Sequence, residues 1–336
     1  MIFRTPSYYG KFRCIAEKCS DNCCIGWEID IDSDTMKYYG SIGGSFGERL
    51  KNNIRDGSFV LTEGERCPFL NSLNLCDIYT ELGEEHLCQI CTDHPRFYEW
   101  FGSVKEGGVG MCCEAAAKLI LSEDMTLTET DFPDEDCESC DPELYRLLLS
   151  ARETMISHLQ SDSFPEAVCT MLDFTVELQY RMDNGEYSLP QWERVTKAEA
   201  PDIKAVMDFY STLEPIDGKW LPFIRSCTSE GGYIREHEIY LRRIAVYMLF
   251  RYFMKGVHDG EIVSRVKLAA VSAWMIGHLV LCSAGGKSVS FEDIAETAMN
   301  YSKEVEYSEE NLEALADAFY EEECFCTSRI IGLFGI

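Results

Sequence analysis

Cysteine is concentrated in the N-terminal third of this sequence, where ten of the 17 cysteines lie between positions 14 and 113. They follow the pattern C-x4-C-x3-C-C, then C-P-F-L, C-x-I-Y, C-x2-C-x2-H-P-R and C-C-E. A free cysteine is otherwise a small apolar residue with a reactive sulfur. A density this high therefore indicates disulfides, a metal or iron–sulfur centre, or redox catalysis. The ten residues are Cys14, Cys19, Cys23, Cys24, Cys67, Cys76, Cys88, Cys91, Cys112 and Cys113.

Disulfides are the least favoured of these three explanations. The first nine residues, MIFRTPSYY, contain no apolar run behind a basic start, so we expect no secretory signal and a cytoplasmic protein. A chain of 336 residues can bury a core without covalent cross-links, and an odd number of cysteines leaves one thiol unpaired. Adjacent cysteines such as Cys23 and Cys24 would also form strained bridges.

Clustered thiolates are typical of zinc or iron–sulfur sites. Ten thiolates exceed the four that one such site needs, which leaves open one cluster with spare thiols, two centres or a bridged centre. The spacing matches neither the ferredoxin run nor a zinc ribbon, so it does not choose the metal. His94, three residues after Cys91, is the candidate nitrogen ligand, and a His-Pro turn is the alternative.

Cysteines outside this region give weaker signals. Cys137 and Cys140 form a C-x2-C pair in an acidic stretch and are expected to be exposed thiols. The roles of Cys324 and Cys326 are left open by the sequence. Three isolated cysteines are expected to pack in the core: Cys169, Cys227 and Cys282.

Three acidic residues alternate near the start of the chain. The segment 27–32 alternates apolar and acidic residues and predicts a short strand. If that strand continues, Asp30, Asp32 and Asp34 would lie on one face of it. That face is expected to be solvated; the alternative is a site for a cationic substrate.

The chain is expected to be mainly α, with an irregular cysteine-rich, metal- or cluster-binding N-terminal module that has little β, followed by an α-helical part. The module would span residues 1–130, with short helices at 33–39 and 113–121 and a Gly-rich turn at 107–110. An acidic, Pro-containing linker would span 131–142, and a helical domain 143–336. Apolar periodicity in that domain predicts helices at 143–161, 165–181, 203–213, 238–256, 262–283, 291–301 and 309–324.

Residues 268–284 are strongly apolar, but they are slightly short for a membrane span, and polar residues interrupt them. A buried core helix is therefore predicted. The formal net charge of −28 disfavours binding to nucleic acids and to anionic membranes. The sequence also lacks G-x-G-x-x-G, P-loop, G-x-S-x-G and H-E-x-x-H motifs.

Five segments of the first 121 residues together resemble the flagellin lysine N-methylases, and their cysteines resemble those of CxxCxxCC-type iron- or zinc-chelating proteins. The helical remainder resembles that family in length and character only. The segments are Phe12-x-Cys14-x4-Cys19-x3-Cys23-Cys24-x2-Trp27, Cys67-Pro68-Phe69-Leu70, Cys76-x-Ile78-Tyr79, Cys91-x2-His94-Pro95-Arg96 and Cys113-Glu114-Ala115-Ala116.

The resemblance implies methylation of lysine ε-amines on flagellin, or on another lysine-bearing protein, by S-adenosylmethionine. It also implies an iron–sulfur cluster, expected to be [4Fe-4S], with zinc as the alternative metal. Cys88 and Cys112 are additions to the shared pattern, and His94 stands where an aromatic residue is commoner. The implied ligands are Cys14, Cys19, Cys23, Cys24, Cys67, Cys76, Cys91 and Cys113.

Methylation requires a neutral lysine, so a site must take a proton from a group whose pKa is about 10. The nearest candidates in sequence are Tyr8, Tyr9, Tyr79 and Asp30. Two other functions stay open: a non-catalytic zinc- or iron-binding interaction or scaffold protein, and a redox or electron-transfer protein.

Overall fold

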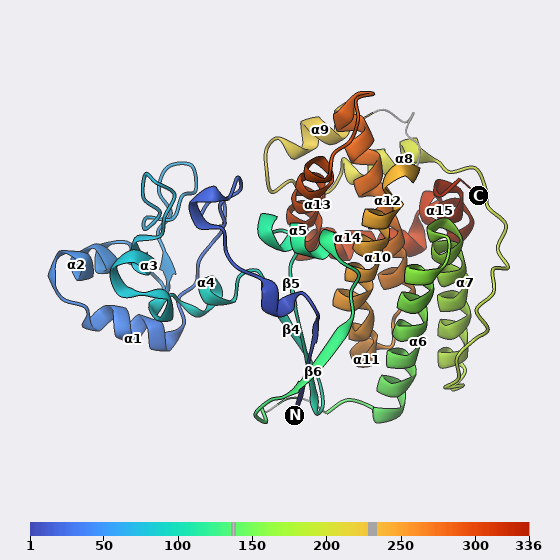
Figure 1. Ribbon diagram of the computed structural model, residues 1–336, viewed down its shortest axis with the longest axis horizontal. Coiled ribbons are helices and arrows are strands. Elements are labelled where there is room, and N and C mark those ends of the chain that lie inside the picture. Colours follow the sequence, from blue (N-terminus) through green and yellow to red (C-terminus); the bar gives the residue numbers. More distant parts are fainter. Residues whose placement is uncertain (136, 138, 228–233, 336) are drawn as a thin grey trace.

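The computed structural model describes residues 1–135, 137, 139–227 and 234–335. Figure 1 shows a small cysteine-rich lobe at the left, a large helical lobe at the right and a sheet at the lower edge between them. Two separate clusters of buried apolar side chains underlie the lobes, one within residues 29–88 and one formed by residues 8–12 and 101–334. The mainly helical fold is confirmed, whereas metal binding by the first lobe stays a prediction.

The cysteine-rich lobe consists of short elements. They are α1 (Ser33–Ser41), α2 (Gly44–Asn52), β2 (Ile54–Arg55), β3 (Ser58–Phe59), α3 (Asp77–Leu82), η3 (Glu84–His86) and α4 (Gln89–Asp93). The prediction of α1 is confirmed, but the strand predicted at 27–32 is wrong, because within it only Asp30 forms a bridge, to Ser58. The Asp32 carboxylate accepts hydrogen bonds from the amides of Thr35 and Gln89, which starts α1 and ties it to α4.

A four-stranded mixed sheet joins the lobes, and it is more extensive than the sequence predicted. Its order is β4–β5–β1–β6; β1 pairs in parallel with β5, and the other pairs are antiparallel. The turn predicted at 107–110 is wrong for Gly107, Gly108 and Val109, which lie within β5. A Cβ at the two glycines would come within 2.7 Å of the Phe3 ring and 2.3 Å of the Phe97 ring, so the glycines let aromatic rings cover the strand. The strands are β1 (Ile2–Pro6), β4 (Arg96–Phe101), β5 (Val104–Val109) and β6 (Leu127–Asp131).

A buried ion network attaches this sheet to the helical lobe. Glu106 on β5 pairs with Arg4 at 3.0 Å and with Arg152 at 2.5 Å. Burial by itself would raise the pKa of Glu106, but Arg152 and Arg4 together hold it below its usual value. The carboxylate therefore stays charged inside the protein and fixes β5 against the helix that carries Arg152.

The helical lobe confirms each helix that periodicity predicted, with small shifts at the ends. The sequence did not predict three further helices, α9, α11 and α15, which are too short to show periodicity. The helices are α5 (Glu114–Ser122), α6 (Pro142–Ser161), α7 (Phe164–Asp183), α8 (Ile203–Tyr210), α9 (Trp220–Ser226), α10 (Glu238–Tyr252), α11 (Gly256–Asp259), α12 (Val263–Ala284), α13 (Phe291–Glu306), α14 (Glu309–Glu321) and α15 (Thr327–Leu333).

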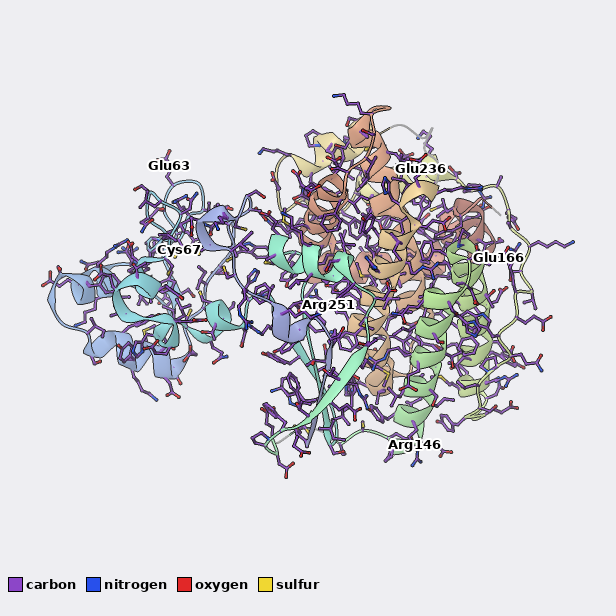
Figure 2. The ribbon with its side chains drawn as sticks, viewed as in Figure 1. Glu63, Cys67, Arg146, Glu166, Glu236 and Arg251 are labelled. Atoms are coloured by element: carbon purple, nitrogen blue, oxygen red, sulfur yellow. The ribbon has the colours of Figure 1, made fainter. Side chains whose placement is uncertain are left out.

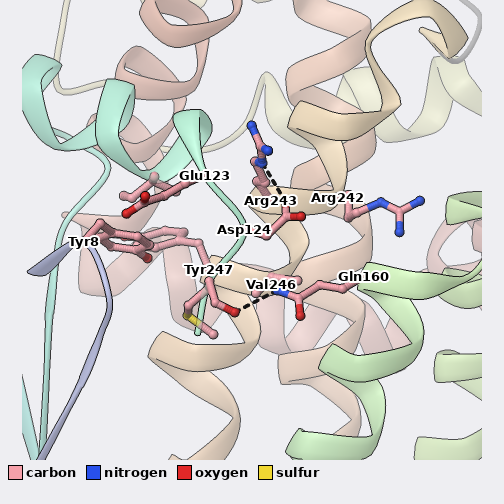
Figure 3. Close-up of a pocket in the computed structure, with 10 residues that line it drawn as sticks. Tyr8, Glu123, Asp124, Gln160, Arg242, Arg243, Val246 and Tyr247 are labelled. Atoms are coloured by element: carbon pink, nitrogen blue, oxygen red, sulfur yellow. Dashed lines mark hydrogen bonds and ion pairs between the residues drawn. The ribbon is translucent and has the colours of Figure 1, made fainter. Parts of the chain in front are cut away.

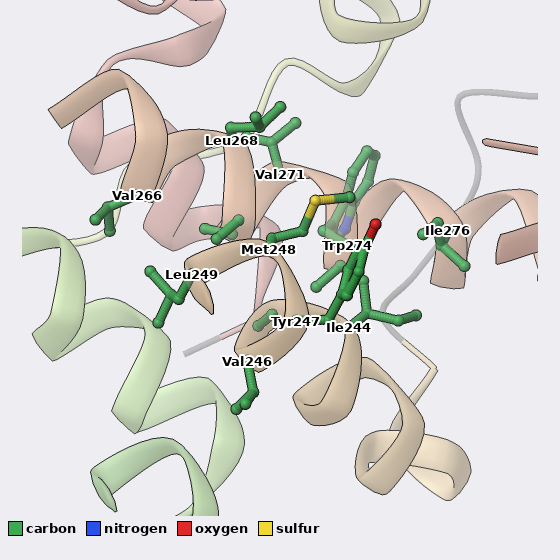
Figure 4. Close-up of a cluster of buried hydrophobic side chains, with 14 of the residues drawn as sticks. Ile244, Val246, Tyr247, Met248, Leu249, Val266, Leu268, Val271, Trp274 and Ile276 are labelled. Carbon is green, nitrogen blue, oxygen red and sulfur yellow. The ribbon is translucent and has the colours of Figure 1, made fainter. Parts of the chain in front are cut away.

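Helix α12 is the centre of the helical core. It packs on α10, where Met248 and Trp274 are among the buried side chains (Figure 4). By length and composition α12 could cross a membrane, but 83% of its most apolar window is buried inside the protein. This burial supports the prediction of a core helix. His278, also predicted to be a core residue, is fully buried and stacks on Trp274.

The predicted domain boundaries stay predictions, but the buried clusters divide the chain elsewhere. Tyr8, Phe12 and the buried residues from Phe101 to Met125 belong to the cluster of the helical lobe. The cysteine-rich lobe is thus an insertion between β1 and β4. Part of the predicted linker, residues 136 and 138, lies outside the described residues.

Candidate functional site

One group of thiols lies inside the cysteine-rich lobe. Cys67 and Cys88 are buried in its core, and the partly buried thiols of Cys24, Cys76 and Cys91 pack against the same cluster. The backbone brings them together, because the amide of Cys67 donates to the carbonyl of Cys24 at 2.8 Å, and Cys76 forms a bridge to Leu70. Five thiols from four separate segments therefore share one small core.

The electrostatics of this group reflect its crowding. The Sγ atoms of Cys88 and Cys91 are 3.4 Å apart, and the hydrogen bond between them raises the pKa of Cys91 and lowers that of Cys88. Burial and the nearby Cys76 and Cys88 raise the pKa of Cys67 to about 11. A bound cation would relieve this cost by stabilising the thiolates.

A second group of thiols lies where the cysteine-rich lobe meets the helical lobe. Burial raises the pKa of Cys113 to about 11, and Cys23 and Cys14 are close enough to add to that shift. Burial likewise raises the pKa of Cys19 to about 12, with a contribution from Cys113. Cys23 is hydrogen-bonded to Cys24, so the two groups meet at this adjacent pair.

Nine of the ten N-terminal cysteines belong to these two groups, which suits soft thiolate ligation of iron or zinc. Even so, in the described parts of the chain, no three Cys, His, Asp or Glu side chains already stand at the spacing of a closed metal site. The donor chemistry fits the implied metal or cluster, but the ligand geometry is not closed. The eight-residue ligand set, with Cys88 and Cys112, stays a prediction.

Cys112 and His94 lie at the junction between the lobes, next to the second thiol group. The Cys112 thiol is buried and hydrogen-bonded to Tyr307, at the end of α13. Burial and the neighbouring Lys303 lower the pKa of His94 to about 4, despite the opposing effect of Asp21. The imidazole of His94 is therefore neutral near pH 7.

The residues that connect the lobes at this junction could not be predicted from the sequence. Lys303 on α13 pairs with Asp21 at 2.7 Å, and the Tyr307 ring stands edge-on to Trp27 at 5.3 Å. A lysine at a helix end resembles any solvated cation in sequence, and only the fold brings it to the cysteines. Figure 2 labels Cys67 within the cysteine-rich lobe and Arg251 at the inner edge of the helical lobe.

The four candidate proton acceptors do not converge. Tyr8 is fully buried, and burial raises its pKa, so its hydroxyl stays protonated near neutral pH and cannot accept a proton as a phenolate. The hydroxyls of Tyr9 and Tyr98 lie 3.2 Å apart, Asp30 accepts a hydrogen bond from Ser58, and Tyr79 is 49% exposed on α3.

The remaining cysteines lie away from both groups. Cys137 is exposed, as expected, and donates to the carbonyl of Gly102. The same prediction is wrong for Cys140, which is half-buried against the core of the helical lobe. Cys169 is fully buried, which confirms core packing. Cys227 is half-buried and packs against the core, as predicted, whereas Cys282 is half-buried at the end of α12. A hydrogen bond with Cys282 raises the pKa of Cys227.

Two pockets among the described residues are candidate sites for the methyl donor. The one in Figure 3 is a narrow seam between Tyr8, α5, α6 and α10 that leaves no room for a water molecule, and Arg243 pairs there with Asp124 at 2.9 Å. A wider, open cavity of about 560 Å³ lies among α7, α12 and α14, beside Tyr180 and Tyr320. Neither lining includes a cysteine.

Fold and site define a class: a two-lobed helical protein whose thiol-rich insertion docks on a helical domain. Residues 227–333 of that domain match the family model for the FliB lysine N-methylase C-terminal domain. This match confirms the resemblance to that family that was read from the cysteine motifs. The matched segment lies in the helical part of the chain, which had resembled the family in length and character only.

Curated relatives agree. The lysine-N-methylases of Salmonella typhimurium and Salmonella choleraesuis are each 24% identical over 207 residues, covering 57% of this chain and 51% of their own. The flagellar biosynthetic protein FliU of Salmonella muenchen is 27% identical over 128 residues, covering 35% of this chain and 76% of its own. This chain thus matches about half the length of the lysine-N-methylases. No solved structure matches it.

Proposed function

We propose that this protein is a cytoplasmic protein-lysine N-methyltransferase that uses S-adenosylmethionine and a cysteine-bound iron–sulfur cluster, with flagellin as its substrate. The observation that carries the proposal is the junction itself. There the residues matched by the family model, through Lys303 and Tyr307, contact the thiol-rich lobe at Asp21 and Trp27. The model that residues 227–333 match is named for lysine N-methylases, and the junction brings the thiol-rich lobe beside these residues.

Both thiol groups would supply ligands to the metal centre. Cys67, Cys76 and Cys91 would bind from within the core of the lobe, and Cys23 and Cys113 from the junction. When bound, a cluster supplies iron, which can take a small-molecule ligand where a thiolate is missing. Oxygen and thiolate ligands differ in softness, so replacing a cysteine by serine should weaken iron binding.

The charge of the protein suits a cationic substrate. The net charge of −28 attracts a lysine-bearing surface and accelerates encounter at low ionic strength. The ε-ammonium must lose its proton before its nitrogen attacks the methyl carbon of the donor. The nitrogen–carbon bond then forms as the carbon–sulfur bond breaks, and the sulfonium becomes a thioether.

The proposal is tested on full-length protein purified without oxygen. Iron and acid-labile sulfide are measured, followed by transfer of labelled methyl groups from S-adenosylmethionine to flagellin. Cys113→Ser should abolish transfer in a protein that stays folded. Cys169→Ala, a fully buried cysteine of the helical lobe, serves as the matched control and should retain transfer. Transfer at the parent rate by Cys113→Ser, or by metal-free protein, would show that the thiols are structural.

A further inference from the structure

A buried carboxylate at the end of α13 organises the helical side of the junction. The Glu306 side chain is completely buried, and its Oε2 atom accepts hydrogen bonds from the hydroxyls of Tyr247 at 2.9 Å and Tyr252 at 3.0 Å. The same oxygen pairs with Arg251 at 3.0 Å. Three donors on one oxygen fix both the carboxylate and the groups around it.

The aromatic surroundings of this carboxylate are already filled by a cation of the chain itself. The Arg251 guanidinium lies 4.8 Å from the Phe97 ring centre, 5.3 Å from that of Tyr252 and 5.2 Å from that of Tyr307. A substrate ammonium therefore has no free place there. The arrangement is suited to holding a structure in position rather than to binding lysine.

This network holds the turn between β5 and α5, which carries Cys112 and Cys113. The amide of Met111 donates a 3.1 Å hydrogen bond to the Tyr247 hydroxyl, which itself donates to Glu306. On the same turn, a Cβ at Gly110 would come within 2.5 Å of the Tyr307 hydroxyl, so the backbone is pressed against the network. Cys112 and Cys113 follow directly, and Cys113 is the N-cap residue of α5.

We propose that Tyr247, oriented by Glu306, is a positioning residue that sets the Gly110–Cys113 turn and thereby the thiols of Cys112 and Cys113. This role depends on the proposed function for its catalytic meaning, because the turn matters to catalysis only if its thiols serve a metal centre. Tyr252 gives a built-in comparison. Its hydroxyl donates to the same Glu306 oxygen, but the turn's only hydrogen bond with the pair, among the described residues, goes to Tyr247.

The test compares Tyr247→Phe with Tyr252→Phe in the full-length, metal-free chain. Alkylation by iodoacetamide is followed at each cysteine by peptide mass spectrometry. Tyr247→Phe should accelerate alkylation of Cys112 and Cys113 at least tenfold, and Tyr252→Phe should change it by less than twofold. Equal rates in the two variants would overturn the proposal. A parallel rise at Cys169 in Tyr247→Phe would also overturn it, since that would show a general loosening of the helical lobe.

Reconstitution with iron and sulfide extends the test to the metal centre. Tyr247→Phe should shift the visible spectrum and lower kcat for methyl transfer about tenfold with KM unchanged, while Tyr252→Phe keeps both. If the parent protein takes up no iron and transfers no methyl group, the proposed function fails. The alkylation rates still decide the role of Tyr247, so the two failures are distinguishable.

Discussion

The two lobes fill their interiors by different means. In the helical lobe, long helices bury continuous apolar faces, as in α12 with its 22 residues. In the cysteine-rich lobe the longest helices have nine residues, and two of its ten buried apolar residues are Cys67 and Cys88. The helical lobe therefore contains its own source of stability. The cysteine-rich lobe, with so small a core, is the part whose stability should depend on what its thiols bind.

Metal removal should distinguish the lobes most strongly. Structural metal sites in small modules contribute on the order of 10 kcal/mol to folding. Chelation of anaerobically purified protein should accelerate hydrogen exchange at the buried amides near Phe59 and Phe69, while those of α12 stay protected. Unchanged exchange in the cysteine-rich lobe would show that this lobe is preformed and that the comparison is wrong.

A core substitution should produce the reverse pattern. Trp274 is 1% exposed on α12, and Trp274→Ala should lower the free energy of unfolding of the helical lobe by about 3–5 kcal/mol. Urea denaturation followed by circular dichroism measures the loss, and Trp274→Phe is the milder control. If the proposed metal centre stabilises only the other lobe, iron content should stay near that of the parent. Loss of iron in proportion to stability would mean that the lobes unfold together.

Acid should weaken the joint between the sheet and the helical lobe. The folded-state pKa of Glu106 is lowered by Arg152 and Arg4 despite burial, so its stabilisation is present above its ordinary pKa, about 4.3. That stabilisation is lost as the pH falls through the lower, folded-state value. Melting temperatures of the parent should therefore fall below about pH 4.3, more steeply than those of Glu106→Gln. Parallel pH profiles for the two proteins would remove Glu106 as the cause.

The smallest effect is expected at the surface between the lobes. The pair of Lys303 and Asp21 is partly exposed, so Lys303→Met should lower stability by about 1 kcal/mol or less. The same change at Lys37, whose pair with Asp34 is far more exposed, should have no measurable effect. Chemical denaturation of both variants, with limited proteolysis of the chain between the lobes, makes the measurement. Equal behaviour would show that this contact does not couple them.

Periodicity determined the helical lobe because each long helix buries one face of its own sequence. The runs that became α6, α7, α10, α12 and α13 could be recognised from three-to-four spacing of apolar residues alone. Density and spacing of cysteines likewise marked the first lobe as the place of unusual chemistry. Both patterns involve residues close together in the sequence, so they can be recognised without knowledge of the fold.

Contacts between distant segments were decided only by the tertiary structure. Gly107 and Gly108 read as a turn because glycine usually breaks strands, yet the rings of Phe3 and Phe97 require them inside β5. Glu306 and Tyr247 are 59 positions apart, and neither shows its role until folding removes both from water. A buried charge must be paired or hydrogen-bonded, and its partners can come from any part of the chain. The residues next to it in the sequence therefore do not show which partners it will have.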